Sequence, residues 1–165
     1  MDLHAEITYP GTSAQETFAL AVDPAFRARV CEETNAIDHD VSVDQYDDGT
    51  ASVTISRTLD ADVPDFAKKL VGDHISIVQR EEWGAATAQG DRTADLVVEV
   101  TGQPAKMTGT ISLEADGDDA REHITGEVTV SVPFIGKKME SELAKGILSA
   151  IEVEQETGLA WLRSP

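Results

Sequence analysis

The sequence predicts an α+β fold in which an antiparallel sheet packs against a long C-terminal helix. Three observations predict it: segments with alternating apolar and polar residues recur along the chain, short turns join several of them, and residues 136 to about 162 form a helical pattern without a proline. Consecutive strands joined by short turns form antiparallel sheets, with helices on one face. We therefore expect a seven-stranded antiparallel sheet wrapped on the C-terminal helix, with two short helices after the first strand.

The first strand and the two short helices have clear local signals. Residues 3–9 alternate apolar and polar side chains, as a half-buried strand does. Ser13 with Glu16 three residues later forms a capping-box pattern, which predicts a helix start. Asp23 followed by Pro24 supplies an N-cap and a first-turn proline for a second helix.

The middle of the chain reads as strands interrupted by one short helix. That helix opens at Pro64 and closes at Gly72, while "DDGT" and "ADGDDA" read as tight turns between strands. The six strands expected after the helix pair cover residues 37–46, 51–59, 74–83, 95–101, 107–114 and 122–132.

Composition and charge exclude several classes of protein. The 165 residues fall within the usual range of one domain, and we treat 1–165 as a single domain with the composition of a soluble globule. The formal net charge is −18, from 31 acidic and 13 basic residues, so nucleic acid and anionic membrane surfaces would be repelled over most of the molecule. We expect no nucleic-acid partner.

Cysteine content and the absence of long apolar runs limit the possible disulfides, metal sites and cellular location. Cys31 is the only cysteine, which rules out an internal disulfide and a multi-cysteine metal site. No stretch has the pattern of a signal peptide or a membrane span, so we expect a cytoplasmic protein without integral membrane association. Nothing in the sequence indicates a cofactor or a metal.

The apolar stripe of the C-terminal helix contains two unexpected carboxylates. Helical spacing places six apolar residues on one face, and Glu140 and Glu154 fall within it. A buried carboxylate is unfavourable unless it is paired, so either the sheet supplies partners or the stripe faces a wet cavity. Alternatively, Glu140 complements the helix N-terminus and Glu154 reaches solvent. The stripe consists of Leu143, Ile147, Ala150, Ile151, Trp161 and Leu162.

The strand patterns offer few partners for such carboxylates. Arg57 shares the apolar face of residues 51–59 and is the only cation that we expect inside, while Glu81 shares the face of Trp83. If Arg57 neutralises an inward glutamate, its replacement by alanine should destabilise the fold by about 3 to 5 kcal/mol.

The element order resembles the helix-grip fold of the START-like (SRPBCC) superfamily, which includes birch-pollen-allergen-type proteins, lipid-transfer domains and polyketide cyclases. The stretches "VPFIGKKMESELAKGI", "EVEQETGLAWL", "REEWG" and "TGQPAKMTGTISL" look like an uncharacterised actinobacterial family within it. Lys137 departs from that family's pattern, which has a second glycine there. The resemblance implies an apolar ligand enclosed between sheet and helix. The residues that match the family's pattern are Val132, Pro133, Gly136, Glu140, Glu154 and Trp161.

The leading hypothesis is a protein that binds or carries a small hydrophobic molecule. A few polar groups would orient the ligand between apolar walls, and the short helix around Phe66 could act as a lid. In the alternative interpretation, the aromatic residues are ordinary core and the cavity is collapsed. The residues expected to bind the ligand are Arg57, Phe66, Glu81, Trp83, Glu140, Ile147, Glu154 and Trp161.

Two other functions stay open. A cyclase or hydratase would use a pocket glutamate as acid or base and Arg57 as oxyanion stabiliser, and Glu140 in that role would need a raised pKa. The sequence contains no catalytic motif, so no catalytic residue is assigned. A non-catalytic interaction module would use the acidic outer sheet face or an edge strand, with the protein a monomer or a weak homodimer.

Overall fold

The structure, a computed structural model, describes residues 1–164 and has the predicted element order. The seven strands and four helices of these residues are arranged as expected from the sequence, so the predicted α+β fold class is confirmed. In chain order they are β1 (Asp2–Tyr9), α1 (Ala14–Ala21), α2 (Pro24–Glu33), β2 (Asp38–Gln45), β3 (Ala51–Asp60), α3 (Asp65–Val71), β4 (His74–Trp83), β5 (Arg92–Val100), β6 (Ala105–Asp116), β7 (Asp119–Val130) and α4 (Gly136–Arg163).

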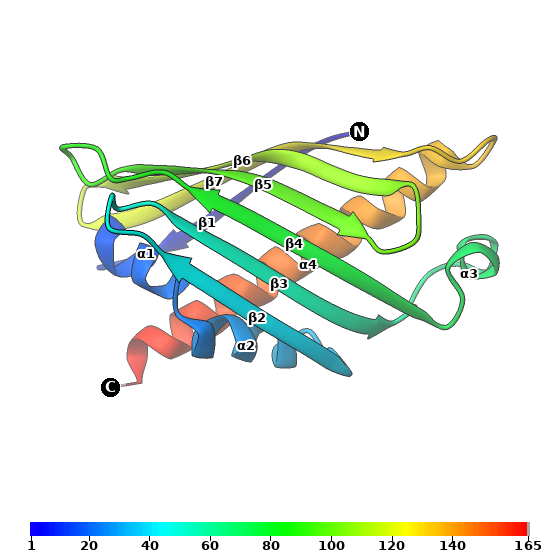
Figure 1. Ribbon diagram of the computed structural model, residues 1–165, viewed down its shortest axis with the longest axis horizontal. Coiled ribbons are helices and arrows are strands. Elements are labelled where there is room, and N and C mark those ends of the chain that lie inside the picture. Colours follow the sequence, from blue (N-terminus) through cyan, green and yellow to red (C-terminus); the bar gives the residue numbers. More distant parts are fainter. Residues whose placement is uncertain (165) are drawn as a thin grey trace.

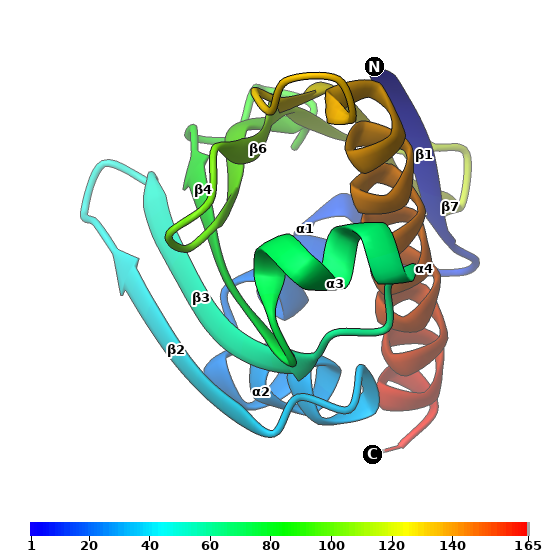
Figure 2. The ribbon, with the colours of Figure 1, turned by 90° about the vertical axis from the view of Figure 1, so that its right-hand side faces the viewer.

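All strands belong to one antiparallel sheet with the order β1-β7-β6-β5-β4-β3-β2. The first strand thus pairs with the last, and β2 forms the other edge. Helix α4 crosses the sheet diagonally (Figure 1), and the sheet curves around it when the molecule is viewed end-on (Figure 2). Helix α3 lies at the end of the molecule where α4 begins, and α2 lies nearer the end of α4.

The first two helices begin where the sequence predicts. The Ser13 hydroxyl accepts the N–H of Glu16 at 3.0 Å and donates to the Glu16 carboxylate at 3.1 Å, which completes the capping box. The Asp23 carboxylate accepts the N–H of Ala25 at 2.9 Å, and Pro24 occupies the first helical position. These caps fix the turn that brings α2 against α4.

A close approach between β1 and α4 depends on a glycine. Gly158 packs under Tyr9, whose side chain is 2% exposed. A Cβ atom at Gly158 would lie 2.3 Å from the Tyr9 hydroxyl oxygen and 2.6 Å from two ring atoms, which is shorter than any real contact. A residue without a side chain is therefore required there for the helix to reach the first strand.

Several boundaries and one burial prediction differ from expectation. Strand β5 begins three residues before the predicted residue 95 and β7 three residues before the predicted residue 122, because backbone pairing with β6 continues through polar residues. Leu162, placed on the buried stripe by its spacing, is one of the exposed large hydrophobic residues, since it lies in the last turn of α4. None of the helices in residues 1–164 is long and apolar enough to cross a membrane.

Candidate ligand cavity

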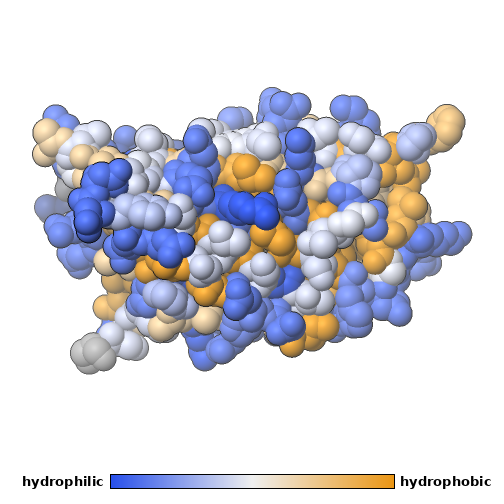
Figure 3. Space-filling view, in the orientation of Figure 1, coloured by the Kyte–Doolittle hydropathy of each residue, from blue (hydrophilic) through white to orange (hydrophobic). Residues whose placement is uncertain are grey.

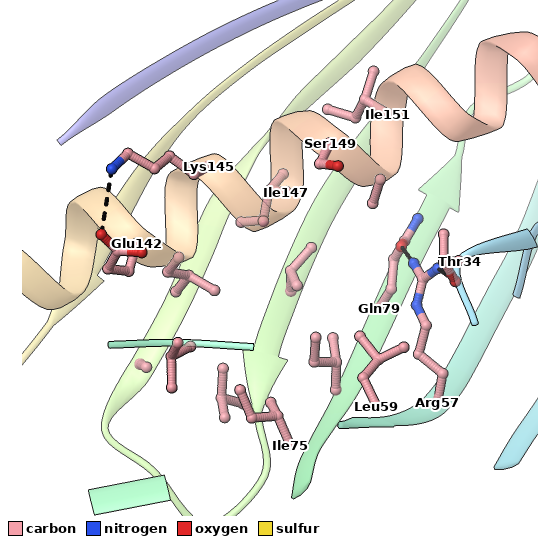
Figure 4. A pocket seen from close by; sticks show the side chains of 18 of the residues that line it. Thr34, Arg57, Leu59, Ile75, Gln79, Glu142, Lys145, Ile147, Ser149 and Ile151 are labelled. Atoms are coloured by element: carbon pink, nitrogen blue, oxygen red, sulfur yellow. Dashed lines mark hydrogen bonds and ion pairs between the residues drawn. The ribbon is translucent and has the colours of Figure 1, made fainter. Parts of the chain in front are cut away.

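A cavity of about 700 Å³ lies between the sheet and α4. Its walls are mainly apolar: strand residues face it from one side and one stripe of α4 from the other. Figure 4 shows Ile147 and Ile151 of α4 with Leu59 and Ile75 of the strands. The alternative interpretation of the sequence, in which aromatic core residues fill the space and the cavity is collapsed, is therefore wrong. The apolar side chains that line it include Ile77, Leu96, Val98, Ile124, Leu143 and Ile147.

The mouth of the cavity lies beside α3. Leu70 and Val71 of this helix line the cavity, and the Gln103 amide donates to the backbone oxygen of Leu70 at 3.1 Å. Near the start of α4, the Lys145 ammonium pairs with Glu142 at 3.3 Å (Figure 4). Helix α3 is thus tied to the turn between β5 and β6 at the edge of the opening.

The opposite, deep end of the cavity holds a buried cluster of charged side chains. Arg27 of α2 is 3% exposed and forms ion pairs with Glu81 of β4 and, at 3.2 Å, with Glu154 of α4. Although burial by itself lowers the pKa of Arg27, the carboxylates of Glu81, Glu154 and Glu122 outweigh it and raise that pKa above its ordinary value. The ion pairs of Arg27 therefore connect α2 to β4 and to α4.

The prediction that Arg57 is the only inward cation is wrong. Arg57 forms no ion pair within residues 1–164; it donates to the Gln79 amide oxygen at 3.0 Å and to the Thr34 hydroxyl at 3.4 Å (Figure 4). The role expected of Arg57 belongs to Arg27, because α2 presents its guanidinium directly to the glutamates.

Glu81 has a full set of hydrogen-bond donors. Besides the ion pair with Arg27, its carboxylate accepts the Gln79 amide at 2.7 Å and the Trp83 indole N–H at 2.9 Å. These donors offset the cost of burying the charge, since a carboxylate in a protein interior needs several partners. Glu81 is thus a fixed anion in the cavity wall.

Glu122 of β7 differs from Glu81, because no hydrogen bond to its carboxylate is found among the described residues. Its side chain lines the cavity and the residue is 6% exposed. Burial, together with the neighbouring Glu154 and Glu81 carboxylates, raises the pKa of Glu122 to about 8, although Arg27 acts in the opposite direction. Burial also raises the pKa of Glu154. At neutral pH, Glu122 is therefore mostly a neutral carboxylic acid that can donate and accept hydrogen bonds.

Five of the eight residues expected to bind a ligand line the cavity. Three of them, Glu81, Glu154 and Arg57, provide polar groups, and the other two are Trp83 and Ile147. The structure brings these five together from β3, β4 and α4.

Glu140 lies outside the cavity lining. Its carboxylate accepts the backbone N–H of Val130 at 3.3 Å and lies 3.7 Å from the Lys137 ammonium, so it joins the start of α4 to the end of β7. The Val130 hydrogen bond lowers the pKa of Glu140, the opposite of what an acid catalyst at this position would need.

Phe66 and Trp161 also lie outside the lining. The Phe66 ring faces the Lys138 ammonium, which lies 5.9 Å from the ring centroid. Trp161 packs edge-to-face on Phe26 with ring centroids 5.7 Å apart, because α2 covers this part of α4. Both residues belong to the packing of helices around the cavity.

The sequence reasoning missed Arg27 and Glu122 as site residues. Arg27 precedes Val30 and Cys31 by three and four residues, so its helical face was recognisable as the buried one. Glu122 precedes Ile124 by two residues on an apolar strand face, which is the corresponding signal for a strand.

Comparison with known proteins assigns the family. Residues 4–162 match the family described as "Protein of unknown function (DUF2505)". The chain belongs to this family. An uncharacterised relative, Rv0481c of Mycobacterium tuberculosis, is 27% identical over 125 residues, which cover 74% of this chain and 71% of the relative. The chain thus has mycobacterial relatives and belongs to an uncharacterised family, in agreement with the resemblance noted in the sequence.

Solved structures with the same fold cover nearly the whole chain. TTHA0849 from Thermus thermophilus is similar with a TM-score of 0.61 and 15% identity, covering 97% of this chain and 98% of that one. The Zhui aromatase/cyclase from Streptomyces sp. R1128 is similar with a TM-score of 0.51 and 12% identity, covering 97% and 90%. These similarities confirm the helix-grip, START-like fold.

Proposed function

We propose that this protein binds or carries a small, mainly hydrophobic molecule in the cavity between the sheet and α4. The observation that carries the proposal is the cavity itself, with a volume of about 700 Å³ and mainly apolar walls. Sites for small molecules have volumes of about 300–1,000 Å³ and are lined mostly by apolar side chains with a few polar groups.

The two ends of the cavity favour an amphipathic ligand. An apolar body fits between residues such as Val98 and Ile147, and a polar group fits the deep end. The neutral Glu122 acid, without a partner among residues 1–164, is a suitable group to bind a hydroxyl or carbonyl there. A ligand bound in this way would satisfy the hydrogen-bonding capacity of Glu122.

A pair of tryptophan substitutions on α4 tests this proposal. Ala150 lines the cavity, whereas Leu148, two residues earlier, is exposed and does not line it. We expect Ala150→Trp to reduce the fluorescence enhancement of N-phenyl-1-naphthylamine, a neutral apolar probe, and Leu148→Trp to retain it. Equal probe binding by both variants, with both folded by circular dichroism, would count against the cavity as the site.

Native mass spectrometry addresses the natural ligand. Protein purified from its own host should show an excess mass over the denatured chain, and solvent extraction should release an apolar compound. Because Ala150→Trp places a bulky indole in the cavity, the same preparation of that variant should carry a smaller excess mass. An excess mass of equal size in both preparations would contradict the proposal.

Proton-transfer catalysis is a second candidate function, and Glu122 is the observation that favours it. Its pKa of about 8 suits an acid or base that works near neutral pH. The similar Streptomyces structure is named an aromatase/cyclase, so an enzyme can be built on this fold. Turnover of a bound compound that Glu122→Gln eliminates without loss of binding would favour this function over carriage alone.

A further inference from the structure

Three segments beside the cavity mouth contact one another in a ring. Gln103, in the turn between β5 and β6, donates to Leu70 of α3, and Pro104 accepts the backbone N–H of Ser131 at 2.9 Å. Ser131 leads into the loop before α4, and Lys138 of α4 lies over the Phe66 ring of α3. We refer to α3, residues 101–106 and residues 131–138 together as the rim.

The loop before α4 holds a phenylalanine in solvent. Phe134 is fully exposed, at 104% relative accessibility, and its backbone has a positive φ of 68°. The N–H of Ile135 donates to the Pro133 oxygen at 2.8 Å across it, which makes a γ-turn of the rare, strained kind. An aromatic side chain held outward in a strained turn adds nothing to the core. Strain of this kind is typical of functional sites.

Other apolar side chains reach the surface beside this loop. Leu70 of α3 is 42% exposed while it also lines the cavity. Hydrophobic side chains gather at the right-hand end of the molecule in Figure 3, where Figure 1 places α3 and the start of α4. The apolar surface of the rim is therefore continuous with the apolar wall of the cavity.

The lysines of this acidic chain are concentrated at the same end. Of six lysines in the sequence, five lie on the rim and the sixth, Lys145, lines the cavity near the start of α4. Of these lysines, only Lys137 and Lys145 form ion pairs within residues 1–164. The rim also contains Asp65, with Asp62 and Asp73 close to it, so its positive charge centres on the first turn of α4 and the second half of α3. The five rim lysines are Lys68, Lys69, Lys106, Lys137 and Lys138.

The turns at the opposite end of the molecule carry aspartates, beside which lie Arg92 and Arg121. The turns between β2 and β3 and between β6 and β7 carry Asp47, Asp48 and Asp118, and no lysine. The 28 residues of α4 span about 40 Å between the two ends. Salt screens charges over about 8 Å at physiological ionic strength, so a surface that meets the rim encounters the lysines and not the net charge of −18.

We propose that the rim docks onto an anionic lipid bilayer, with Phe134 inserted and the lysines at the lipid headgroups. A single aromatic side chain on a protruding turn suits insertion into a soft apolar phase, and lysines beside it suit anionic headgroups. Docking in this orientation turns the cavity mouth toward the bilayer. The proposal goes beyond the proposed function and rests on the rim alone.

Sedimentation with vesicles tests the docking. Wild-type protein should co-sediment with phosphatidylcholine vesicles that contain about 30% phosphatidylglycerol. A much smaller fraction should co-sediment with pure phosphatidylcholine vesicles, and high salt should reduce the fraction bound to the anionic vesicles. We expect Phe134→Ser to lower the partition coefficient of the protein between vesicles and buffer about tenfold or more. Replacing Lys137 and Lys138 by glutamine should weaken it about fivefold for each lysine. Lack of retention of the wild type on anionic vesicles would overturn the proposal.

Tyr46→Ser is the matched control, because Tyr46 is 52% exposed in the turn between β2 and β3 at the other end. Tyr46→Ser should leave binding to the vesicles unchanged. Phe134→Ser should leave the melting temperature unchanged, since the Phe134 side chain is fully exposed and not packed. If a soluble polyanion releases the protein while Phe134→Ser binds vesicles like the wild type, the rim fits an acidic protein surface, and insertion is excluded.

Discussion

Glu122 determines how the stability of this protein should depend on pH. Its pKa is raised from an ordinary value of 4.5 to about 8, so the folded state binds more protons than the unfolded state between these two values. The contribution of Glu122 to the free energy of unfolding is therefore fully present below pH 4.5 and is lost as the pH rises through 8. We expect Glu122→Gln to flatten the wild-type decline in unfolding free energy over this window, measured by urea denaturation at several pH values.

The control for this measurement lies on the same strand. Glu127 of β7 is exposed, so Glu127→Gln should leave the wild-type pH profile unchanged. Because Glu154 also titrates with a raised pKa, some slope will persist in Glu122→Gln. Identical profiles for the wild type and Glu122→Gln would mean that Glu122 is ionised in the folded protein.

Loss of Arg27 should destabilise the fold more than loss of Arg57. Arg27→Met leaves Glu81 and Glu154 without their cation, and breaking a buried ion pair from one side costs about 3–5 kcal/mol. Arg57→Met removes only hydrogen bonds to Gln79 and Thr34, and the shorter of these, from the charged guanidinium to Gln79, is worth about 1.5–3 kcal/mol. Unfolding free energies from urea titration distinguish the two. Equal losses of unfolding free energy in the two variants would contradict the assignment of Arg27, rather than Arg57, as the partner of the buried glutamates.

Residue roles were the part of the site least accessible to sequence analysis. The glutamates at 81 and 154 were expected inside because they interrupt apolar periodicity, and both line the cavity. Arg27 was not recognised because partners were sought on the strands, whereas α2 supplies the cation. Which helix side chain reaches across to a strand depends on how the helices pack, and local pattern does not contain that information.

At the scale of elements, Gly146 and Gly158, both inside α4, should respond in opposite ways to alanine. Gly158→Ala forces a Cβ atom into the buried Tyr9 ring, and overpacking of this kind costs about 1–3 kcal/mol. Gly146 has nothing within 4 Å of the added atom, so Gly146→Ala should stabilise the helix by about 0.5–1 kcal/mol. Thermal unfolding of both variants measures this, and the same sign for both would contradict the packing at Gly158.

The elements themselves were almost fully predictable. Capping signals placed α1 and α2, and apolar alternation placed β1 and β4, because these depend on neighbours in sequence. The first residues of β5 and β7 were not predictable, since polar residues there continue the pairing with β6. Backbone hydrogen bonding to a partner strand is a tertiary property that leaves no mark on the residues themselves.

At the scale of the whole molecule, net charge should make stability dependent on salt. A formal charge of −18 on 165 residues causes self-repulsion in the folded state, which screening by salt relieves. The buried pairs of Arg27 are screened much less. We expect the midpoint of urea unfolding to rise as sodium chloride increases from 10 mM to 500 mM. A midpoint that falls would indicate that surface ion pairs outweigh the repulsion.

The pairing of β1 with β7 has a consequence for synthesis of the chain. Within the described residues 1–164, the first strand hydrogen-bonds to no strand other than β7, whose residues lie more than 100 positions later. During translation β1 has no partner strand until most of the chain has left the ribosome, and contacts this distant in sequence slow folding. The protein is therefore expected to fold late, and nascent chains that stop before residue 119 should expose an unpaired β1 to chaperones.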